Sequence, residues 1–497
     1  MLAIMVTGDV DMYKKIFKTE IIVVVFILVL LISTLMVKPV IGVADNGDFD
    51  RIMKSVGLEY LTKEYGERYF GHIHREYGMQ DVFISPKGYY FSSSVPIVAA
   101  AVSLKKLVNN NGIFDIRFLA FVYSILFLFT VYLLLRHNKQ KIPFANWVLA
   151  ALVVLVFADI GYISYFNSLF SEPVSFLFML MTVGLGLIIA QKEKPSIWLL
   201  IGFYAAAIFL VGSKLQNAPT GMLIILLGLR LWFMRREIKW RAVIIVASVL
   251  LVATMGASYK LTSGALKACN MYHSVFIGIL KDSPDVEKDL AELGLNKELA
   301  VLAETRIYQR DLPIDPMGLY VREEFFGKIS RTDVILFYMK HPLRYLQKLD
   351  NTAKLSFYIR PDYLGNYEKA EGIKYRQMTK TFSLWSSIKG KIFPKSLIFL
   401  VLFYLAYFAV VIRGYFKSKS LSRRFYLDIF MILGLTCISQ LMIPVLGDGE
   451  TDLLKHMFFF NVCFDIMFTV SVLWVVNKAF KLRDRLAKSE TAGLSEV

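Results

Sequence analysis

The feature that most constrains this fold is a series of apolar runs, each long enough to cross a bilayer. A helix of roughly 20 apolar residues spans the hydrocarbon core. By that rule the chain of 497 residues contains about ten spans. They cover approximately residues 21–41, 117–135, 146–164, 173–190, 196–212, 217–234, 242–258, 396–412, 425–446 and 456–477. The sequence therefore predicts an all-α polytopic membrane protein.

The distribution of positive charge predicts the orientation of these spans. Lys and Arg give the chain a net charge of +17, and they gather in alternate short loops such as 136–141, 235–241 and 413–424. The intervening short loops are nearly free of them, and basic loops stay on the cytoplasmic side. We expect an integral protein of a bacterial plasma membrane with both termini cytoplasmic. No basic stripe on a soluble face indicates a nucleic-acid partner.

Two long segments lie on the predicted outer side. We expect an N-terminal transmembrane module over 1–258 with a first outer loop over 42–116, and an extracytoplasmic loop domain over 259–395. Three C-terminal spans over 396–478 and a cytoplasmic tail over 479–497 would complete the chain. Amphipathic stretches at 49–54 and 95–108 predict interfacial helices in the first outer loop. The second loop is expected to form a small, mostly helical domain in which Gly294 stops a helix.

The predicted outer face collects polar residues from four separate turns. The first span is followed at once by the acidic motif Ala44-Asp45-Asn46-Gly47-Asp48-Phe49-Asp50-Arg51. The other turns contribute Glu172, Lys214, Gln216, Asp448, Lys455 and His456, and a further acid, Asp159, falls inside or near the end of a span. Since the predicted cytoplasmic loops carry mainly basic residues, a mixed acidic and basic site is expected on the outer face.

Each of these residues also has a purely structural interpretation. Asn46-Gly47 is a strong turn signal, and acids cap a following helix. Glu172 suits the first turn of a helix, where a carboxylate meets the positive end of the dipole. Lys214 and Lys455 are placed to snorkel into the interface. His72, His74 and His273 are expected to be ordinary surface residues. Four turns that all bring charge to one depth are harder to explain separately.

Acids and cations at this depth suit a lipid-phosphate-linked sugar. Arg51, Lys214, Gln216, Lys455 and His456 are the candidates to bind substrate or its phosphate. A carboxylate would accept the proton of the attacking hydroxyl, and direct displacement with one base predicts inversion. Asp50, Asp159 and Asp448 are further acidic candidates.

This layout resembles the GT-C class of polytopic glycosyltransferases, which take sugars from polyprenyl-phosphate carriers. The likeness rests on the acidic motif Asp45-Asn46-Gly47-Asp48 after the first span, on the interfacial helices of the first loop, and on Glu172 in the turn 167–173. That turn is similar to the acidic turn of protein mannosyltransferase and aminoarabinose transferase relatives. The resemblance implies a catalytic base at Asp45, a role that Asp48 could share, and a secondary acid at Glu172.

The resemblance also implies partners: a polyprenyl-phosphate-linked sugar donor, a glycan, lipid or protein acceptor, and membrane lipids. No cofactor is certain, and the motif 45–50 leaves a divalent cation, Mg²⁺ or Mn²⁺, open because carboxylates are oxygen ligands. Two other functions compete with the enzyme. A transporter or flippase of lipid-linked sugars would line a central path with charge, and a glycan-assembly protein would need only a partner-binding outer domain.

Overall fold

The computed structural model describes residues 19–80 and 90–494 of the chain. In this part, eight helices are long and apolar enough to cross a membrane. They are Thr19–Met36, which closes in the π-turn η1 (Ile32–Met36), α5 (Arg117–His137), α8 (Glu172–Gln191), Leu215–Met234, α11 (Ile238–Lys260), α18 (Leu397–Lys417), α19 (Leu421–Asp448) and the first part of α21 (Phe458–Leu494). The prediction of an all-α polytopic membrane protein is confirmed.

Two of the predicted spans differ from straight, full-length helices. One is a bent pair, Pro143–Phe157 and Ile160–Asn167, whose parts meet at 46°. It is built from α6 (Pro143–Leu152), η2 (Val153–Phe157), α7 (Ile160–Ile163) and η3 (Ser164–Asn167). The bend falls where Asp159 leaves helical geometry and its carboxylate accepts a hydrogen bond from the N–H of Gly161. The other is α9 (Ile197–Ser213), an apolar helix of 17 residues.

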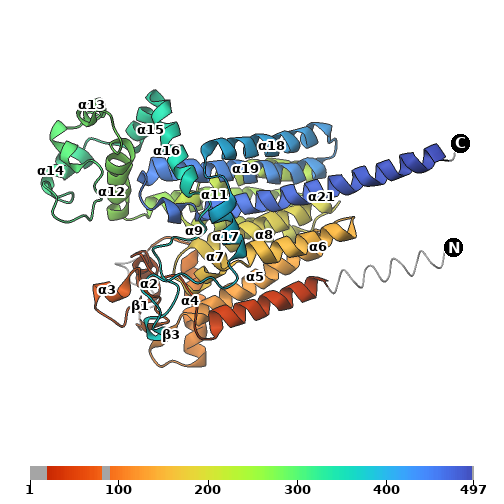
Figure 1. Cartoon of the computed structure of the whole chain (residues 1–497), viewed down its shortest axis with the longest axis horizontal. Coiled ribbons are helices and arrows are strands. Elements are labelled where there is room, and N and C mark those ends of the chain that lie inside the picture. The colour runs from red at the N-terminus through yellow and green to blue at the C-terminus, as the bar shows by residue number, and fades with distance from the viewer. Residues whose placement is uncertain (1–18, 81–89, 495–497) are drawn as a thin grey trace.

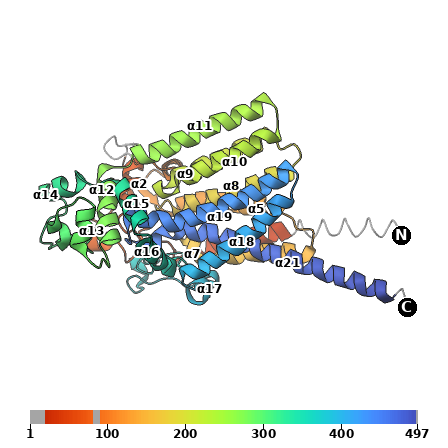
Figure 2. The same cartoon turned by 90° about the horizontal axis from the view of Figure 1, so that it is seen from above.

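The spans run side by side along the long axis of the molecule, and most non-spanning structure gathers at one end (Figure 1). We call this the loop-bearing end, made of residues 37–80, 90–116 and 261–396. The described part of the first span begins at the opposite end, where α21 also finishes (Figure 1). Seen from above, α11 and α10 (Thr220–Met234) lie at one edge of the bundle, and α18 and α21 lie toward the other (Figure 2).

The first long loop contains a small sheet that the sequence did not predict. Its elements are α2 (Phe49–Val56), β1 (Leu58–Glu59), α3 (Tyr65–Arg68), β2 (Glu76–Met79), α4 (Ser94–Val108) and β3 (Ile113–Asp115). The three strands pair antiparallel in the order β1-β2-β3. Gly57 ends α2 in the left-handed conformation, at φ 70°, and so turns the chain into β1. The two helices expected near 49–54 and 95–108 are present.

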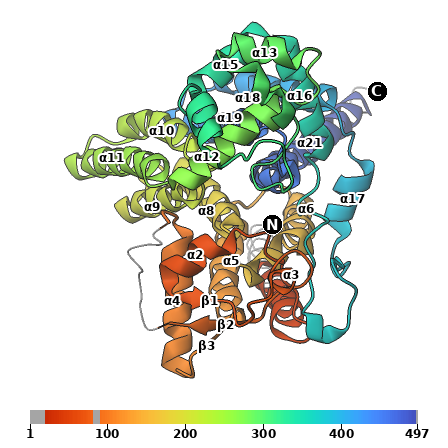
Figure 3. The ribbon, with the colours of Figure 1, turned by 90° about the vertical axis from the view of Figure 1, so that its left-hand side faces the viewer.

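The second long loop is mostly helical, as expected. It contains α12 (Gly264–His273), η5 (Ser274–Ile279), α13 (Val286–Glu292), η6 (Lys297–Leu302), α14 (Leu319–Val321), η7 (Arg322–Phe326), α15 (Arg331–Lys340), α16 (Pro342–Leu355), η8 (Lys369–Glu371) and α17 (Leu384–Ile392). Gly294, at φ 69°, follows α13 closely. Ser330 and Asp333 form a capping box that starts α15. Figure 3 looks onto this end and shows α12, α13, α15 and α16 grouped apart from α2, α3 and α4.

Candidate active site at the loop-bearing end

The turn between α19 and α21 hydrogen-bonds to both long loops of the loop-bearing end. Gly449 follows α19 with φ 62° and ψ −136°, a conformation that only glycine adopts readily. A Cβ there would lie 2.5 Å from the carbonyl oxygen of His273 and 2.6 Å from the amide nitrogen of Gly278. The close approach turns the chain into the short helix α20 (Leu453–His456), which carries Lys455.

Lys455 joins this turn to the acidic motif after the first span. Its ammonium group is almost completely buried, forms an ion pair with Asp48 and donates a hydrogen bond of 3.1 Å to Asn46 Oδ1. Arg51 contacts the other oxygen of Asp48 at 3.0 Å. Burial would raise the pKa of Asp48, but the charges of Lys455 and Arg51 outweigh it and hold the pKa well below its usual range. Asp48 is therefore a carboxylate that stays ionised, and its side chain is 30% exposed.

The same motif contacts the turn through a second acid. Asn46 Nδ2 donates a hydrogen bond of 3.1 Å to Asp452, which also accepts one from the hydroxyl of Tyr363. Asp452 has φ 51°, a left-handed conformation uncommon outside glycine. Burial raises the pKa of Asp452, against the opposing charge of Lys455. Segments about 400 residues apart along the chain thus meet in one polar cluster.

Asp45 is more deeply buried and holds the backbone of the motif. Its Oδ1 accepts hydrogen bonds from the N–H groups of Gly47, at 2.8 Å, and Phe49, at 3.1 Å. Its Oδ2 accepts one of 2.6 Å from the hydroxyl of Tyr60. Burial raises the pKa of Asp45 to about 6, although all three hydrogen bonds act to lower it. Both oxygens are occupied, so Asp45 fixes the shape of the turn.

Glu172 and Lys214 form the second half of the cluster because α8 and α9 are antiparallel neighbours. Glu172 begins α8, Lys214 follows the end of α9, and the two side chains form an ion pair of 2.6 Å. Glu172 is buried, whereas Lys214 is 23% exposed. Glu172 Oε2 has no hydrogen-bond partner in the described part of the chain. The charges of Lys214 and Glu172 act on Asp48 and Lys455 respectively, which places both halves within electrostatic reach.

Asp448, Gln216 and His456 form a neighbouring group. It also contains His273, which the sequence did not lead us to expect there. His273 is buried, at 5% exposure, so the expectation of a surface residue is wrong. Its Nε2 accepts from the N–H of Ile307, which leaves Nδ1–H to donate to Asp448 at 2.9 Å. His456 contacts the other oxygen of Asp448 at 3.4 Å and Gln216 Oε1 at 3.1 Å.

Two of the acidic candidates lie outside the cluster. Asp50 points away on α2 and pairs with Lys54 at 3.3 Å in an exposed position. Asp159 is buried at the bend of the broken span, where it accepts hydrogen bonds from the N–H groups of Gly161 and Ser386. These contacts assign Asp159 the structural task of capping α7 and holding α17.

Sequence reasoning missed a buried ion pair beside that bend. Lys389 of α17 and Asp465 of α21 are both fully buried and lie 2.7 Å apart. Asp465 also accepts hydrogen bonds from Tyr162, at 2.6 Å, and Trp385, at 2.8 Å. An ionisable residue inside the apolar run 456–477 was a signal that could have singled out Asp465. Its partner could not have been found from spacing, because Lys389 lies in the preceding loop.

The polar cluster combines groups that suit an anionic, hydroxyl-bearing ligand. Arg51 and Lys214 present partly exposed cations, and the ionised carboxylate of Asp48 contacts Arg51 at 3.0 Å. Among the described residues, no group of three His, Cys, Asp or Glu side chains is arranged to hold a metal ion. The arrangement can bind a phosphate by its cations and accept a proton from a hydroxyl.

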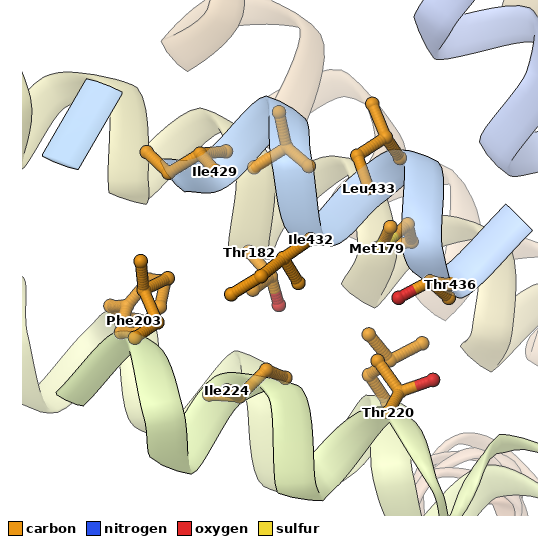
Figure 4. A pocket seen from close by; sticks show the side chains of 12 residues that line it. Met179, Thr182, Phe203, Thr220, Ile224, Ile429, Ile432, Leu433 and Thr436 are labelled. Carbon is orange, nitrogen blue, oxygen red and sulfur yellow. The ribbon is translucent and has the colours of Figure 1, made fainter. Parts of the chain in front are cut away.

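A small apolar pocket lies deeper in the bundle, between α8, α9, α10 and α19 (Figure 4). Thr220 and Thr436 line it together with aliphatic and aromatic side chains (Figure 4). The hydroxyls of both threonines lack a hydrogen-bond partner within the described residues. No charged side chain lines the pocket, so it is separate from the polar cluster.

One comparison with known proteins agrees with this architecture. No curated protein matches the chain. The family model described as the YfdI N-terminal transmembrane domain matches residues 8–493, which is nearly the whole chain. The chain therefore belongs to the YfdI N-terminal transmembrane domain family.

Proposed function

We propose that this protein is a membrane glycosyltransferase that moves a sugar from a polyprenyl-phosphate donor to an acceptor of the cell envelope, at the loop-bearing end. The single observation that carries the proposal is the polar cluster of Asp48, Arg51, Glu172, Lys214 and Lys455. Four turns far apart in sequence supply it, and the ends of membrane spans position it. The GT-C resemblance of the sequence supports the same activity.

The cations of the cluster would bind the donor phosphate. Lys214 and Arg51 are partly exposed, at 23% and 38% of their side chains, and a phosphate at the depth of the lipid headgroups would reach them first. Lys455 lies behind them, at 4%. As the bond between sugar and phosphate breaks, negative charge grows on the phosphate oxygen, and fixed cations stabilise that charge more than they stabilise the bound donor.

Asp48 is the better placed of the two acids to accept the acceptor's proton. It is partly exposed, whereas Asp45 is buried with both oxygens engaged. Lys455 and Arg51 keep Asp48 ionised, and they also hold its pKa low. Asp48 is therefore a weak base, which takes the proton late, once bonding to the anomeric carbon has made the attacking hydroxyl acidic. The hydroxyl oxygen would attack the anomeric carbon as its proton passes to Asp48 and the phosphate leaves with the bonding electrons. One direct displacement inverts the anomeric configuration.

Glu172 would hold the transferred sugar. Its buried Oε2 has no partner among the described residues, and an unpaired carboxylate oxygen costs free energy until a donor meets it. A sugar hydroxyl is such a donor. Lys214, paired with the other oxygen at 2.6 Å, would then lie between the sugar and the phosphate.

The test is transfer of radiolabelled sugar from a panel of polyprenyl-phosphate donors, in membranes containing the wild type or one variant. We expect Asp48→Asn to lower kcat by about a hundredfold or more, as loss of a general base does. Asp50→Asn is the matched control, since Asp50 lies two residues away and outside the cluster. We expect Lys214→Ala to raise the KM for donor. Because this variant also leaves the buried Glu172 without its cation, its transfer is compared with the wild type at equal amounts of folded protein.

The outcomes separate the competing functions. Loss of transfer in Asp45→Asn with full transfer in Asp48→Asn would assign the base to Asp45. If no donor supports transfer by the wild type, but the purified protein moves lipid-linked sugar across vesicles, the protein is a flippase. Transfer that is equal in the Asp48→Asn and Asp50→Asn variants would refute the assignment of Asp48.

A further inference from the structure

The hairpin of α15 and α16 exposes large apolar side chains that the proposed reaction does not use. Leu336 and Met339 of α15 are 46% and 70% exposed, and Leu343 and Leu346 of α16 are 79% and 49% exposed. Residues three or four apart share one face of a helix. The four side chains therefore form two short stripes, one at the end of α15 and one at the start of α16, next to the turn that joins the two helices. We call them the apolar corner. A cluster of this kind needs a partner, unlike single exposed apolar residues.

Contacts with α19 fix the depth of the apolar corner relative to the spans. The hydroxyl of Tyr345 donates a hydrogen bond of 3.2 Å to the carbonyl of Met442. α19 has 28 residues and is about 42 Å long, against a hydrocarbon core of about 30 Å. A centred α19 extends about four residues beyond the core at each end. Met442, six residues before the helix ends, lies close to the boundary.

Contacts with α18 give the same depth independently. Asp350, near the end of α16, accepts a hydrogen bond of 3.1 Å from the N–H of Leu397, the first residue of α18. α18 has 21 residues, so its length of about 32 Å matches the core with almost no excess. Its first residue therefore marks the boundary. The contacts of Tyr345 and Asp350 therefore put the middle of α16 close to the boundary, and Leu343 and Leu346 lie within two residues of Tyr345.

The surroundings of the apolar corner favour lipid over a protein partner. Leu402 and Leu405 on the outer surface of α18 are 60% and 63% exposed, as side chains that face acyl chains are. α16 packs against α18 and α19, and the α15–α16 hairpin lies in front of these two helices, at the upper side of the molecule, when the loop-bearing end faces the viewer (Figure 3). Lys340 follows Met339; it contacts Glu292 at 3.6 Å, yet its side chain is 65% exposed, and a cation beside an apolar face suits lipid headgroups.

We propose that the α15–α16 hairpin is an interfacial wedge, in which Leu336, Met339, Leu343 and Leu346 insert into the boundary between headgroups and acyl chains. The wedge is tied to the polar cluster's turn, because Arg331 donates hydrogen bonds to the carbonyls of Leu446, at 2.7 Å, and Gly447. It anchors the second long loop to the bilayer next to the turn 447–456. This inference stands on exposure and depth, and it does not depend on the proposed reaction.

The test measures lipid contact directly by fluorescence quenching. The full-length protein with Cys269→Ser retains only the buried Cys437 and Cys463, and receives Leu343→Cys or, separately, Met339→Cys for bimane labelling. Leu319→Cys is the matched aqueous control, since Leu319 is 72% exposed on α14, far from the spans in Figure 1. Leu405→Cys is the lipid-facing control. All four labelled proteins are placed in phosphatidylcholine–phosphatidylglycerol nanodiscs.

A doxyl group near the lipid headgroup should lower the fluorescence at 343 and 339 about twofold or more, as contact within the interface requires. Iodide in the water should quench the label at 319 and spare both. Quenching at 343 and 339 by iodide, as at 319, would overturn the wedge. Protection from both quenchers at the two positions would also overturn it, because a second copy or another protein would then cover the corner.

Discussion

Replacing Asp45 with Asn tests whether burying the charged carboxylate of Asp45 lowers the stability of the folded protein. In Asp45→Asn the amide oxygen keeps the hydrogen bonds from the N–H groups of Gly47 and Phe49, and the amide nitrogen faces the hydroxyl of Tyr60. The geometry of the turn is thereby retained while the charge is removed. The variant separates the role of the charge from the role of the turn.

The magnitude follows from the pKa of Asp45, which burial raises from 3.8 to about 6. The folded state binds this proton more tightly than the unfolded state, so the native protein loses stability as the pH rises from about 4 to about 6. Above that range the loss is complete and amounts to about 3 kcal/mol, at 1.36 kcal/mol for each pKa unit. The Asn variant carries no charge there and escapes this loss.

The assay is thermal unfolding of the detergent-solubilised protein between about pH 4 and pH 8, the range over which the linkage acts. We expect the wild type and Asp45→Asn to unfold at similar temperatures at the acidic end. At neutral pH the variant should be the more stable by about 1–3 kcal/mol, less any weakening of its contact with Tyr60. A variant that is less stable than the wild type at neutral pH would refute the reasoning. If that difference depended on added Mg²⁺ or Mn²⁺, a bound cation would be offsetting the charge.

Other perturbations give equally definite outcomes. Lys389→Met leaves the fully buried Asp465 without its cation and should lower the free energy of unfolding by about 3–5 kcal/mol. The double variant Lys389→Met/Asp465→Leu should recover most of that stability. Equal stability of the single and double variants would contradict this reasoning. Gly449→Ala places a Cβ 2.5 Å from the carbonyl oxygen of His273, so we expect a low yield or a sharply lowered unfolding temperature. Gly256→Ala is the control, because its Cβ meets open space. Arg51→Ala removes a partly exposed cation that contacts Asp48 at 3.0 Å. The KM for donor should rise, and an unchanged KM would show that the donor phosphate does not use Arg51.

The fold was largely readable from the sequence because the bilayer imposes one strong rule. A spanning segment must satisfy its own backbone hydrogen bonds, so long apolar runs become helices. The sequence signal was weaker where the runs are interrupted. Asp159 lies inside an apolar stretch, yet its carboxylate ends one helical segment and begins the next at a 46° bend. The short sheet of the first loop gave no signal at all, since β1 has two residues and β3 has three.

The sequence predicted which residues of the candidate site lie at the same membrane depth, but it did not predict which of them contact each other. Topology placed Asp48, Glu172, Lys214 and Lys455 at one end, and the structure brings all four together. Their partners depend on how helices pack side by side, which spacing along the chain does not encode. Nothing in the sequence indicates that Lys455 pairs with Asp48, about 400 residues away along the chain.

The division of labour between Asp45 and Asp48 shows why the structure was needed to rank two neighbouring acids. Both belong to one short motif, and residue type alone treats them alike. In the fold, Asp45 turns inward to two backbone N–H groups and Tyr60, whereas Asp48 turns toward Lys455 and Arg51 and remains partly exposed. The carboxylate of Asp45 shapes the turn, and the turn leaves the carboxylate of Asp48 partly exposed. Under the proposed function, Asp45 would be the support and Asp48 the reactive group, because only Asp48 meets solvent.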